Sequence, residues 1–373
     1  MKVFVAGTRG VPDIPGGVER HCEQLYPRIV GEGVAVRLAR RSSYVSTALA
    51  SWKGIDLVDL FSPRKKSLEA IIHTLLAIIT ARRWGADIVH IHAIGPAIMV
   101  PLARLLGMKV VVTNHGPDYD RQKWGGPAKA ILRLGEYLGC KYANEVVVIS
   151  TPIADIVSRR CGRSSNLVYN GVPIPELEPG FSYPESLGLE KGKYFLAVAR
   201  LVPEKGLGDL LEAYSRLDTG FKLVIAGDAD HEDAFSRALK QTAAATPGVI
   251  MPGYVTGRDL AELYTHAGPY ILPSYHEGLP ISLLEALSYG LQTIVSDIPA
   301  NSEVKLEECH YFPVANVDAL AEKLQSAISK KWDPVDRNKA REFVQKKYNW
   351  DDIAKQTLAV YNKALWPGAS ENR

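Results

Sequence analysis

Short apolar runs rich in β-branched residues alternate with amphipathic segments along almost the whole chain. In the first half, several of these runs have no polar interruption, as in the VVV of residues 110–112 and 146–148. Strands buried on both faces of a parallel sheet have this composition. The predicted strands are 2–6, 34–39, 55–60, 87–92, 109–113, 145–149 and 166–169, with helical patterns between them, such as 67–83 and 129–142.

The same alternation begins again after a proline-rich stretch, residues 173–184, which we interpret as a linker. The predicted strands of the second half are 194–199, 222–226, 249–251, 270–272 and 293–296. Two βαβ arrays in tandem predict an α/β protein with two Rossmann-like, doubly wound parallel-sheet domains facing across a cleft. We assign residues 1–175 to the first domain and 176–349 to the second. Residues 350–373 form a final helix that either packs locally or crosses back to the first domain.

Composition and charge narrow the classes of partner. The 373 residues are 46% hydrophobic and 23% charged, which is typical of a globular protein. The net charge of +3 divides into +8 over residues 1–178 and −5 over the rest, and the basic half indicates an anionic partner. Because no arginine-rich or basic–aromatic motif is present, we expect no nucleic-acid binding. A membrane surface or a phosphate-bearing acceptor is the anionic partner that we expect for the basic half.

The chain shows no sign of crossing a membrane or leaving the cytoplasm. The first apolar run, MKVFVAG, is too short for a signal-peptide core, and residues 68–80 fall short of the roughly 20 that a spanning helix needs. Four scattered cysteines without paired spacing predict reduced thiols. We therefore expect a cytoplasmic protein, with contact to the inner face of the membrane as the one membrane-related role to test.

One helix in the first domain has two interpretations. Arg64, Lys65 and Lys66 precede the apolar stretch, and Arg82 and Arg83 follow it. The segment is either a helix that docks on an anionic membrane carrying a lipid-linked acceptor, or an ordinary domain helix with charged ends.

The strongest chemical motif is HEGLPISLLEALSYG, residues 276–290, which follows a predicted strand. Pro280 is expected at the first helical position, which leaves the amides around Gly278 and Leu279 free to bind a diphosphate. Glu277 before the helix and Glu285 within it are spaced to reach different hydroxyl groups of one extended ligand. The structural alternative makes Glu277 a capping residue and Glu285 a surface helix residue.

A second motif, ARLVPEKG, directly follows the predicted strand 194–199. Arg200 and Lys205 flank a proline-stiffened loop, and a guanidinium with an ammonium group is suited to stabilise a leaving diphosphate. The alternative is a pair of solvated charges on a surface loop.

The first half contributes two further candidates at strand ends. The loop from Gly7 to Gly17 does not have the G-x-G-x-x-G spacing of dinucleotide sites, but Gly17 at a helix entrance would allow a ligand close to the backbone. His115 comes just after the strand 109–113. His90 and His92 share a face of an earlier strand, and we interpret both as buried structural histidines. No cluster with metal-ligand spacing is evident, so we expect no metal and no cofactor.

Together these motifs resemble glycosyltransferase family 4, retaining enzymes of the GT-B architecture, over nearly the full chain. The family's glutamate pair matches Glu277 and Glu285 in EGLPISLLEA, its basic pair matches Arg200 and Lys205, and its hinge matches Asn-Gly-Val at 170–172. The opening GTRGVPDIPGGVER resembles bacterial polysaccharide transferases, rhamnosyltransferases among them.

The resemblance implies a role for each candidate. Arg200 and Lys205 would bind the diphosphate of a nucleotide-sugar donor in place of a metal. Glu277, with the amides of Gly278 and Leu279, would hold the transferred sugar, and Glu285 the ribose. Three further assignments are implied: Tyr254 and Val255 beside the base, Gly17 against a donor phosphate or the acceptor, and His115 beside the anomeric carbon. The acceptor would be a saccharide or a lipid-linked molecule.

The resemblance also leaves some questions open. Where relatives often carry Gly-Asp-Gly-Pro, this chain has Gly-Asp-Ala-Asp at 227–230, so the base is not predicted. The family implies retention of configuration, and because no nucleophile is evident near the anomeric carbon, we favour front-face attack over a covalent intermediate. The alternatives are a nucleotide-sugar epimerase of the same architecture and a non-catalytic nucleotide-sugar-binding subunit.

Overall fold

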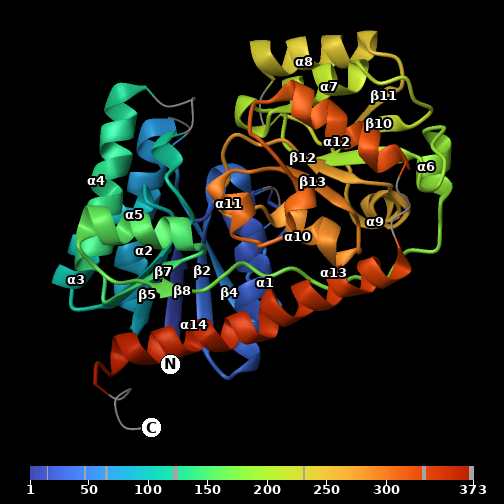
Figure 1. Cartoon of the computed structure of the whole chain (residues 1–373). Helices are drawn as coiled ribbons and strands as arrows, with labels where there is room; N and C mark the ends of the chain where they lie inside the picture. The colour runs from blue at the N-terminus through green and yellow to red at the C-terminus, as the bar shows by residue number, and fades with distance from the viewer. Residues whose placement is uncertain are drawn as a thin grey trace. The chain divides into compact units, whose positions relative to one another are not determined.

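A computed structural model of the chain describes residues 1–14, 16–45, 48–63, 66–120, 125–229, 232–329 and 333–368. Backbone contacts divide the chain into two units (Figure 1). Unit 1 comprises Met1–Gly171 and Trp350–Arg373, and unit 2 comprises Val172–Asn349. Each unit contains one sheet with helices packed on it.

Unit 1 is built on a sheet with the strand order β3-β4-β2-β1-β5-β6-β7-β8. Every strand pair is parallel except β3–β4. Its elements are β1 (Lys2–Ala6), α1 (Gly17–Gly31), β2 (Ala35–Arg41), η1 (Ser42–Tyr44), β3 (Ser51–Trp52), β4 (Ile55–Leu60), α2 (Lys66–Trp84), β5 (Ile88–His92), η2 (Pro96–Met99), α3 (Val100–Leu105), β6 (Lys109–Asn114), η3 (Asp118–Asp120), α4 (Gly126–Tyr142), β7 (Glu145–Val148), α5 (Thr151–Cys161), β8 (Asn166–Leu167) and α14 (Trp350–Leu365).

Unit 2 has a wholly parallel sheet with the strand order β11-β10-β9-β12-β13-β14. Its elements are α6 (Ser182–Ser186), β9 (Tyr194–Val198), η4 (Pro203–Lys205), α7 (Leu207–Ser215), β10 (Lys222–Ala226), α8 (Ala234–Ala245), β11 (Val249–Gly253), α9 (Gly257–His266), β12 (Tyr270–Leu272), α10 (Ile281–Ser288), β13 (Thr293–Ser296), α11 (Pro299–Ser302), η5 (Glu308–His310), β14 (Tyr311–Phe312), α12 (Val317–Ser329) and α13 (Pro334–Lys347).

The sequence predicted these sheets well. Every predicted strand is present, with ends within two residues of those observed, because the central strands are buried along almost their whole length and are mainly apolar. The two-residue strands β3 and β14 were missed, since two residues carry no periodicity. The predicted linker, 173–184, ends too late: Pro184 lies buried within α6.

The change from unit 1 to unit 2 lies a few residues before the predicted boundary at 175. The backbone amide of Val172 donates to the carbonyl of Tyr348 at 3.0 Å, and the Arg341 guanidinium donates to the carbonyl of Pro175 at 2.9 Å. These hydrogen bonds fix residues 172–175 against unit 2. Such long-range contacts leave no pattern in the local sequence.

The C-terminal helix α14 belongs to unit 1, a choice that the sequence left open. Trp350, Ile353 and Tyr361 are buried in the same hydrophobic core as Leu25 and Tyr26 of α1. An ion pair of 2.7 Å between Arg28 and Asp351 lies beside this contact. The apolar stripe of α14 thus completes the core of the unit that begins the chain.

No helix among the described residues is long and apolar enough to span a membrane. The helix considered for membrane docking, α2, buries one face within unit 1: His73, Thr74 and Ile78 are inaccessible to solvent. Arg64 and Lys65, which belonged to that hypothesis, lie outside the described residues. The packing of α2 favours the interpretation as an ordinary domain helix.

Candidate functional site

Both sheets have a point where the strand order reverses, and in unit 2 the basic pair and the glutamate motif lie there. In unit 2 the chain adds β10 and β11 on one side of β9, and β12 to β14 on the other. In unit 1 the reversal lies between β1 and β5. Loops diverge at such a point on the carboxyl edge of a parallel sheet, which leaves room for a ligand. The loops after β9 and β12 carry the basic pair and the glutamate motif.

Two glycines allow the loops after β9, β10 and β12 to approach one another closely. A Cβ atom on Gly206, whose φ is +62°, would lie 2.1 Å from the carbonyl oxygen of Pro273. A Cβ on Gly227 would lie 1.9 Å from the carbonyl oxygen of Ala199. The backbone amide of Tyr275 also donates to the carbonyl of Glu204 at 2.9 Å. The loops after β9 and β12 therefore form one connected surface.

Lys205 and Glu277 meet on this surface. The Lys205 ammonium donates to Glu277 Oε1 at 2.6 Å, and the side chains are only 15% and 11% exposed. Glu277 Oε1 also accepts from the hydroxyl of Ser274 at 2.7 Å. The carbonyl of Ser274 accepts from the Ser296 hydroxyl at 2.6 Å, which ties this loop to the end of β13. The pair is thus held in a fixed geometry from several sides.

The start of α10 lies directly after this pair. Pro280 precedes the first helical residue, Ile281, instead of occupying that position as the sequence predicted. Its carbonyl accepts from the amides of Leu283 and Leu284, each at 3.1 Å. Within the part of the chain that the structure describes, the amides of Gly278 and Leu279 have no backbone carbonyl as a partner. Positive potential from these amides and from the helix dipole therefore lies beside Lys205.

The remaining candidates of unit 2 occupy the same side of the sheet. Arg200 follows β9 and is partly exposed. Tyr254 and Val255 follow β11, two strands away, and Tyr254 is 67% exposed. Glu285 lies one turn into α10, where its Oε2 accepts from the Tyr264 hydroxyl at 3.4 Å. The carboxyl edge therefore presents, in strand order, an aromatic ring at β11, basic groups at β9 and carboxylates after β12.

In unit 1, a buried carboxylate organises the loop that begins at Gly7. Glu19 Oε1 accepts from the Thr8 hydroxyl at 3.1 Å and from the Arg9 amide at 2.9 Å. Gly16 has a φ of +151°, which residues with a side chain rarely adopt, and a Cβ there would lie 1.9 Å from the Glu19 carboxylate, so that position requires glycine. Gly17, by contrast, is exposed, and a Cβ there would meet no atom within 4 Å. The glycine that the packing requires is therefore Gly16.

His115 is the partly exposed end of a buried hydrogen-bonded chain. Its Nε2 lies 3.0 Å from Nδ1 of His92, and Nε2 of His92 lies 2.6 Å from the hydroxyl of Tyr26. The chain continues to His90 Nδ1, 2.9 Å from Tyr26, and to the hydroxyl of Tyr361 on α14, 2.7 Å from His90. Both His90 and His92 are buried, as the sequence predicted, but His92 also orients the candidate residue His115.

Burial keeps this histidine cluster neutral near pH 7. Desolvation lowers the pKa of His21 to about 4, although a hydrogen bond to Asn170 opposes the shift. Desolvation also lowers the pKa of His90 to about 3 and holds the pKa of His92 and His115 well below the usual range. A cationic ring would lose its hydration without gaining a carboxylate partner.

Sequence reasoning missed three residues that shape these loops: Glu19, Ser274 and Tyr264. Glu19 could have been found, because a glutamate in the first turn after a glycine loop is well placed to accept amide protons. Ser274 follows β12, two residues before the glutamate motif, and a lone serine in a loop carries no signal in the sequence. Tyr264, on α9, meets α10 only in the folded chain.

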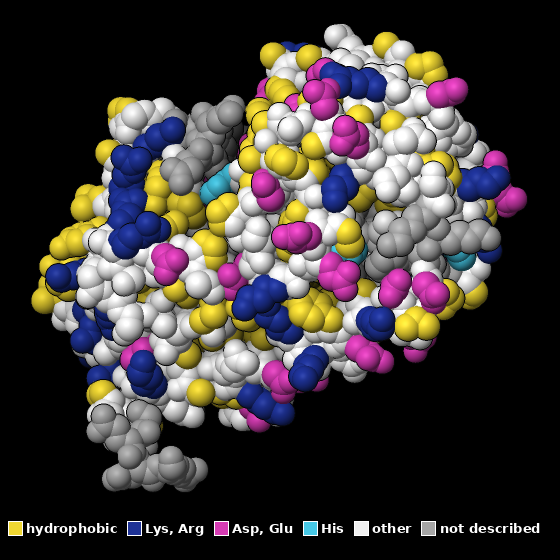
Figure 2. Space-filling view, viewed as in Figure 1, with side chains coloured by type: hydrophobic (Ala, Val, Ile, Leu, Met, Phe, Trp, Pro, Cys, Tyr) yellow, Lys and Arg dark blue, Asp and Glu magenta, His cyan; other side chains and the backbone are white. Residues whose placement is uncertain are grey.

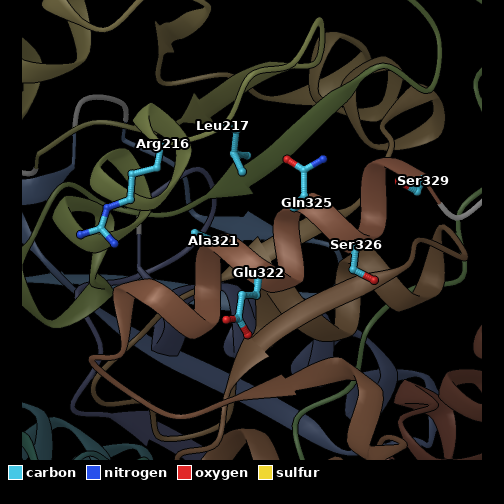
Figure 3. A pocket seen from close by; sticks show the side chains of 7 residues that line it. All are labelled: Arg216, Leu217, Ala321, Glu322, Gln325, Ser326 and Ser329. Carbon is cyan, nitrogen blue, oxygen red and sulfur yellow. The ribbon is translucent and has the colours of Figure 1, made fainter.

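A shallow depression elsewhere on unit 2 does not belong to this site (Figure 3). It lies between α12 and the end of α7, and is lined by Arg216, Leu217, Ala321, Glu322, Gln325, Ser326 and Ser329. None of the candidate residues lines it. It is too open to enclose a small molecule.

Two family models match this chain. One, described as Glycosyltransferase Family 4, matches residues 15–175, and the other, described as Glycosyl transferases group 1, matches residues 182–350. An uncharacterized glycosyltransferase of Methanocaldococcus jannaschii is 26% identical to the chain and aligns with 98% of it and 99% of the relative.

Solved structures match the fold over nearly the full length. A sucrose-phosphate synthase from Thermosynechococcus elongatus superposes with a TM-score of 0.81 at 19% identity, covering 97% of this chain and 98% of its own. The Anabaena protein HepE, in complex with UDP and glucose, superposes with a TM-score of 0.80 at 16% identity, covering 97% and 99%.

Proposed function

The chain belongs to the family 4 glycosyltransferases and has their GT-B fold, and on that premise we propose that it is a retaining, metal-independent transferase. Its donor is a nucleoside-diphosphate sugar, and its acceptor a saccharide or lipid-linked glycan. The observation that carries the proposal is the partly buried Lys205–Glu277 pair beside the amides of Gly278 and Leu279, which precede α10. The complex of HepE with UDP and glucose, on the same fold, supports a donor of this class.

In this mechanism unit 2 holds the donor. The bond between the anomeric carbon and the β-phosphate oxygen breaks, and its electron pair leaves with the diphosphate. The charge that develops there is stabilised by Arg200, Lys205 and the amides of Gly278 and Leu279, which replace a metal ion. Glu277 binds the sugar hydroxyls, and Glu285 the ribose.

The acceptor hydroxyl attacks the same face of the sugar that the diphosphate leaves, and its proton passes to the departing phosphate oxygen. Configuration is therefore retained without a covalent intermediate. We assign the acceptor-side groups to unit 1, with His115 and the α1 entrance at Gly17 as the candidates. A neutral His115 can accept a hydrogen bond from a hydroxyl group or donate one to it. It does so without placing a positive charge beside an oxocarbenium-like sugar.

A two-step experiment tests this function. UDP, GDP and ADP, with their sugar derivatives, are first compared for thermal stabilisation of the protein, and the best donor is then incubated with and without saccharide acceptors. We expect transfer only with an acceptor, a product of retained configuration by NMR, and full activity in chelator. An inverted product contradicts the mechanism, and epimerisation of the donor alone supports the epimerase instead. Arg200→Ala should lower turnover about 10²- to 10³-fold while the protein stays folded.

We also propose that α4, and not α2, contacts an anionic membrane that carries the acceptor. Figure 2 shows Lys and Arg side chains over α4 with hydrophobic side chains beside them. On α4, Leu134 and Tyr137 are 48% and 41% exposed, and Arg133 and Lys141 lie on the same helix. Such a combination suits the boundary between headgroups and acyl chains.

Co-sedimentation with vesicles containing anionic lipid tests this contact. We expect salt-sensitive binding that Leu134→Glu abolishes and that Arg82→Ala, on α2, leaves unchanged. Equal binding by the wild type and the Leu134→Glu variant would remove α4 from the proposal.

A further inference from the structure

Three imidazole rings of unit 1 surround a common point. His21 comes from α1, His92 from the end of β5, and His115 from the turn after β6. One nitrogen of each ring lies within 4.8 Å of the corresponding nitrogens of the other two. Their ring centres are 5.1 Å apart for His21–His115, 5.3 Å for His92–His115 and 5.4 Å for His21–His92. Sequence spacing did not reveal this cluster, because its members come from three separate elements.

These separations match those of a tetrahedral metal site. A zinc ion bound by three histidines has metal–nitrogen distances of about 2.0–2.1 Å, which at tetrahedral angles places the nitrogens about 3.4 Å apart and the ring centres about 5.2 Å apart. The observed ring centres lie close to that value. The rings would therefore need to rotate, and the backbone would hardly need to move, for three nitrogens to face one ion.

One nitrogen of the cluster is buried without a partner. His21 is 3% exposed, and its Nδ1 lies 2.6 Å from the side-chain oxygen of Asn170, which assigns the ring proton to Nδ1. Nε2 then carries a lone pair, and it has no hydrogen-bond partner among the described residues. A buried acceptor without a donor is rare in folded proteins. The contact to Asn170 is also the kind of outer-shell interaction that orients metal-binding histidines.

The second ligand, His92, has a similar outer contact. Its Nε2 lies 2.6 Å from the Tyr26 hydroxyl, and its Nδ1 faces Nε2 of His115 at 3.0 Å. A metal would replace the hydrogen bond between the two rings with two metal–nitrogen bonds. The ring that donates the hydrogen bond between His92 and His115 must move its proton to its other nitrogen, which faces away from the metal, so the exchange leaves the number of protons unchanged.

We propose that His21, His92 and His115 form a binding site for a divalent transition metal such as Zn²⁺, with a fourth position open to solvent. The opening lies on the side of His115, which is partly exposed whereas the other two rings are buried. Three histidines with one open position is an arrangement that zinc adopts in proteins. A bound ion takes Nε2 of His115 from its contact with His92 and places a positive charge beside the ring that the proposed function assigns to the acceptor. On the proposed function, Zn²⁺ is therefore a reversible inhibitor.

Metal binding is tested on the full-length protein without reference to turnover. The metal-free protein is titrated with Zn²⁺ by calorimetry and with Co²⁺ by absorption, since four-coordinate cobalt gives intense visible bands. We expect one equivalent to bind with micromolar or tighter affinity. Asn170→Ala, which removes the outer contact to His21, should weaken binding about 10- to 100-fold. His21→Leu should abolish the cobalt bands, and His310→Gln, on unit 2, should change nothing.

The outcomes separate the site from the catalytic proposal. No binding by the wild type, or equal binding by the wild type and by a folded His21→Leu variant, overturns the metal site and leaves the cluster as a hydrogen-bonded structural group. If His21→Leu does not fold, Asn170→Ala is the test instead, and binding equal to that of the wild type then overturns the metal site. Zn²⁺ that binds without slowing transfer contradicts the inhibitory role alone. A protein without transferase activity would contradict the proposed function and leave the calorimetric result standing.

Discussion

Replacing Lys205 by alanine is the sharpest test of how unit 2 recognises a diphosphate. The change removes the ammonium group that lies 2.6 Å from Glu277 and beside the start of α10. It also leaves the Glu277 carboxylate, only 11% exposed, with the Ser274 hydroxyl as its remaining described donor. Two losses are expected, one in the stability of unit 2 and one in ligand binding, and they can be measured separately.

The magnitudes follow from burial and charge. Removing one partner costs about 3–5 kcal/mol in a fully buried ion pair and at most about 1 kcal/mol in an exposed one. For this partly exposed pair we expect about 2 kcal/mol, which lowers the melting temperature by several degrees. A hydrogen bond to a charged group contributes about 1.5–3 kcal/mol, so nucleoside-diphosphate affinity should fall about 10- to 100-fold. Turnover should fall about 10²- to 10³-fold, because the leaving charge loses its cation.

Calorimetry with a nucleoside diphosphate and the matching monophosphate separates these effects. Because Lys205 is assigned to the β-phosphate, the variant should lose affinity for the diphosphate and keep that for the monophosphate. Lys193→Ala is the matched control: Lys193 lies before the same strand, β9, in an exposed ion pair of 2.7 Å with Glu190. Diphosphate affinity within about twofold of the wild type, in a folded Lys205→Ala variant, would refute the assignment.

Three further predictions follow from the same structure. Glu285→Ala should weaken nucleotide binding about tenfold by calorimetry, and unchanged affinity would remove Glu285 from the ribose site. Gly206→Ala should lower unfolding free energy by at least about 2 kcal/mol, because φ is +62° and the new Cβ would lie 2.1 Å from a carbonyl oxygen. Its control Gly208→Ala, in α7 with no atom within 4 Å, should instead be neutral or stabilising in urea denaturation. Acidification should destabilise unit 1, because the folded pKa values of His21 and His90, about 4 and about 3, lie below the unfolded value of about 6.5. The contribution of these histidines to the free energy of unfolding is therefore full above about pH 6.5. Below that pH it falls by about 1.4 kcal/mol per pH unit for each histidine. An unchanged melting temperature between pH 7.5 and 5.5 would contradict this.

Particular residues show how far sequence reasoning reached in the candidate site. Lys205 and Glu277 could be named because each follows a recognisable strand and carries a charge. That they bind each other could not be predicted, since 72 positions separate them and β9 and β12 become neighbours only in the sheet. That the packing requires Gly16 could not be predicted, because adjacent glycines look alike until the Glu19 carboxylate is placed, and the role of Gly17 beside a ligand stays a prediction.

Local patterns in the chain determined the strands, the long helices and the two-unit α/β organisation. Apolar runs and helical periodicity involve only residues that are close in the sequence, so they can be recognised without the tertiary structure. Strand order, the association of α14 with unit 1 and the convergence of His21, His92 and His115 were decided by the tertiary structure alone. Each depends on which apolar surfaces pack together and on which distant polar groups form hydrogen bonds. These contacts stabilise one another cooperatively across the whole unit, so no local segment determines them.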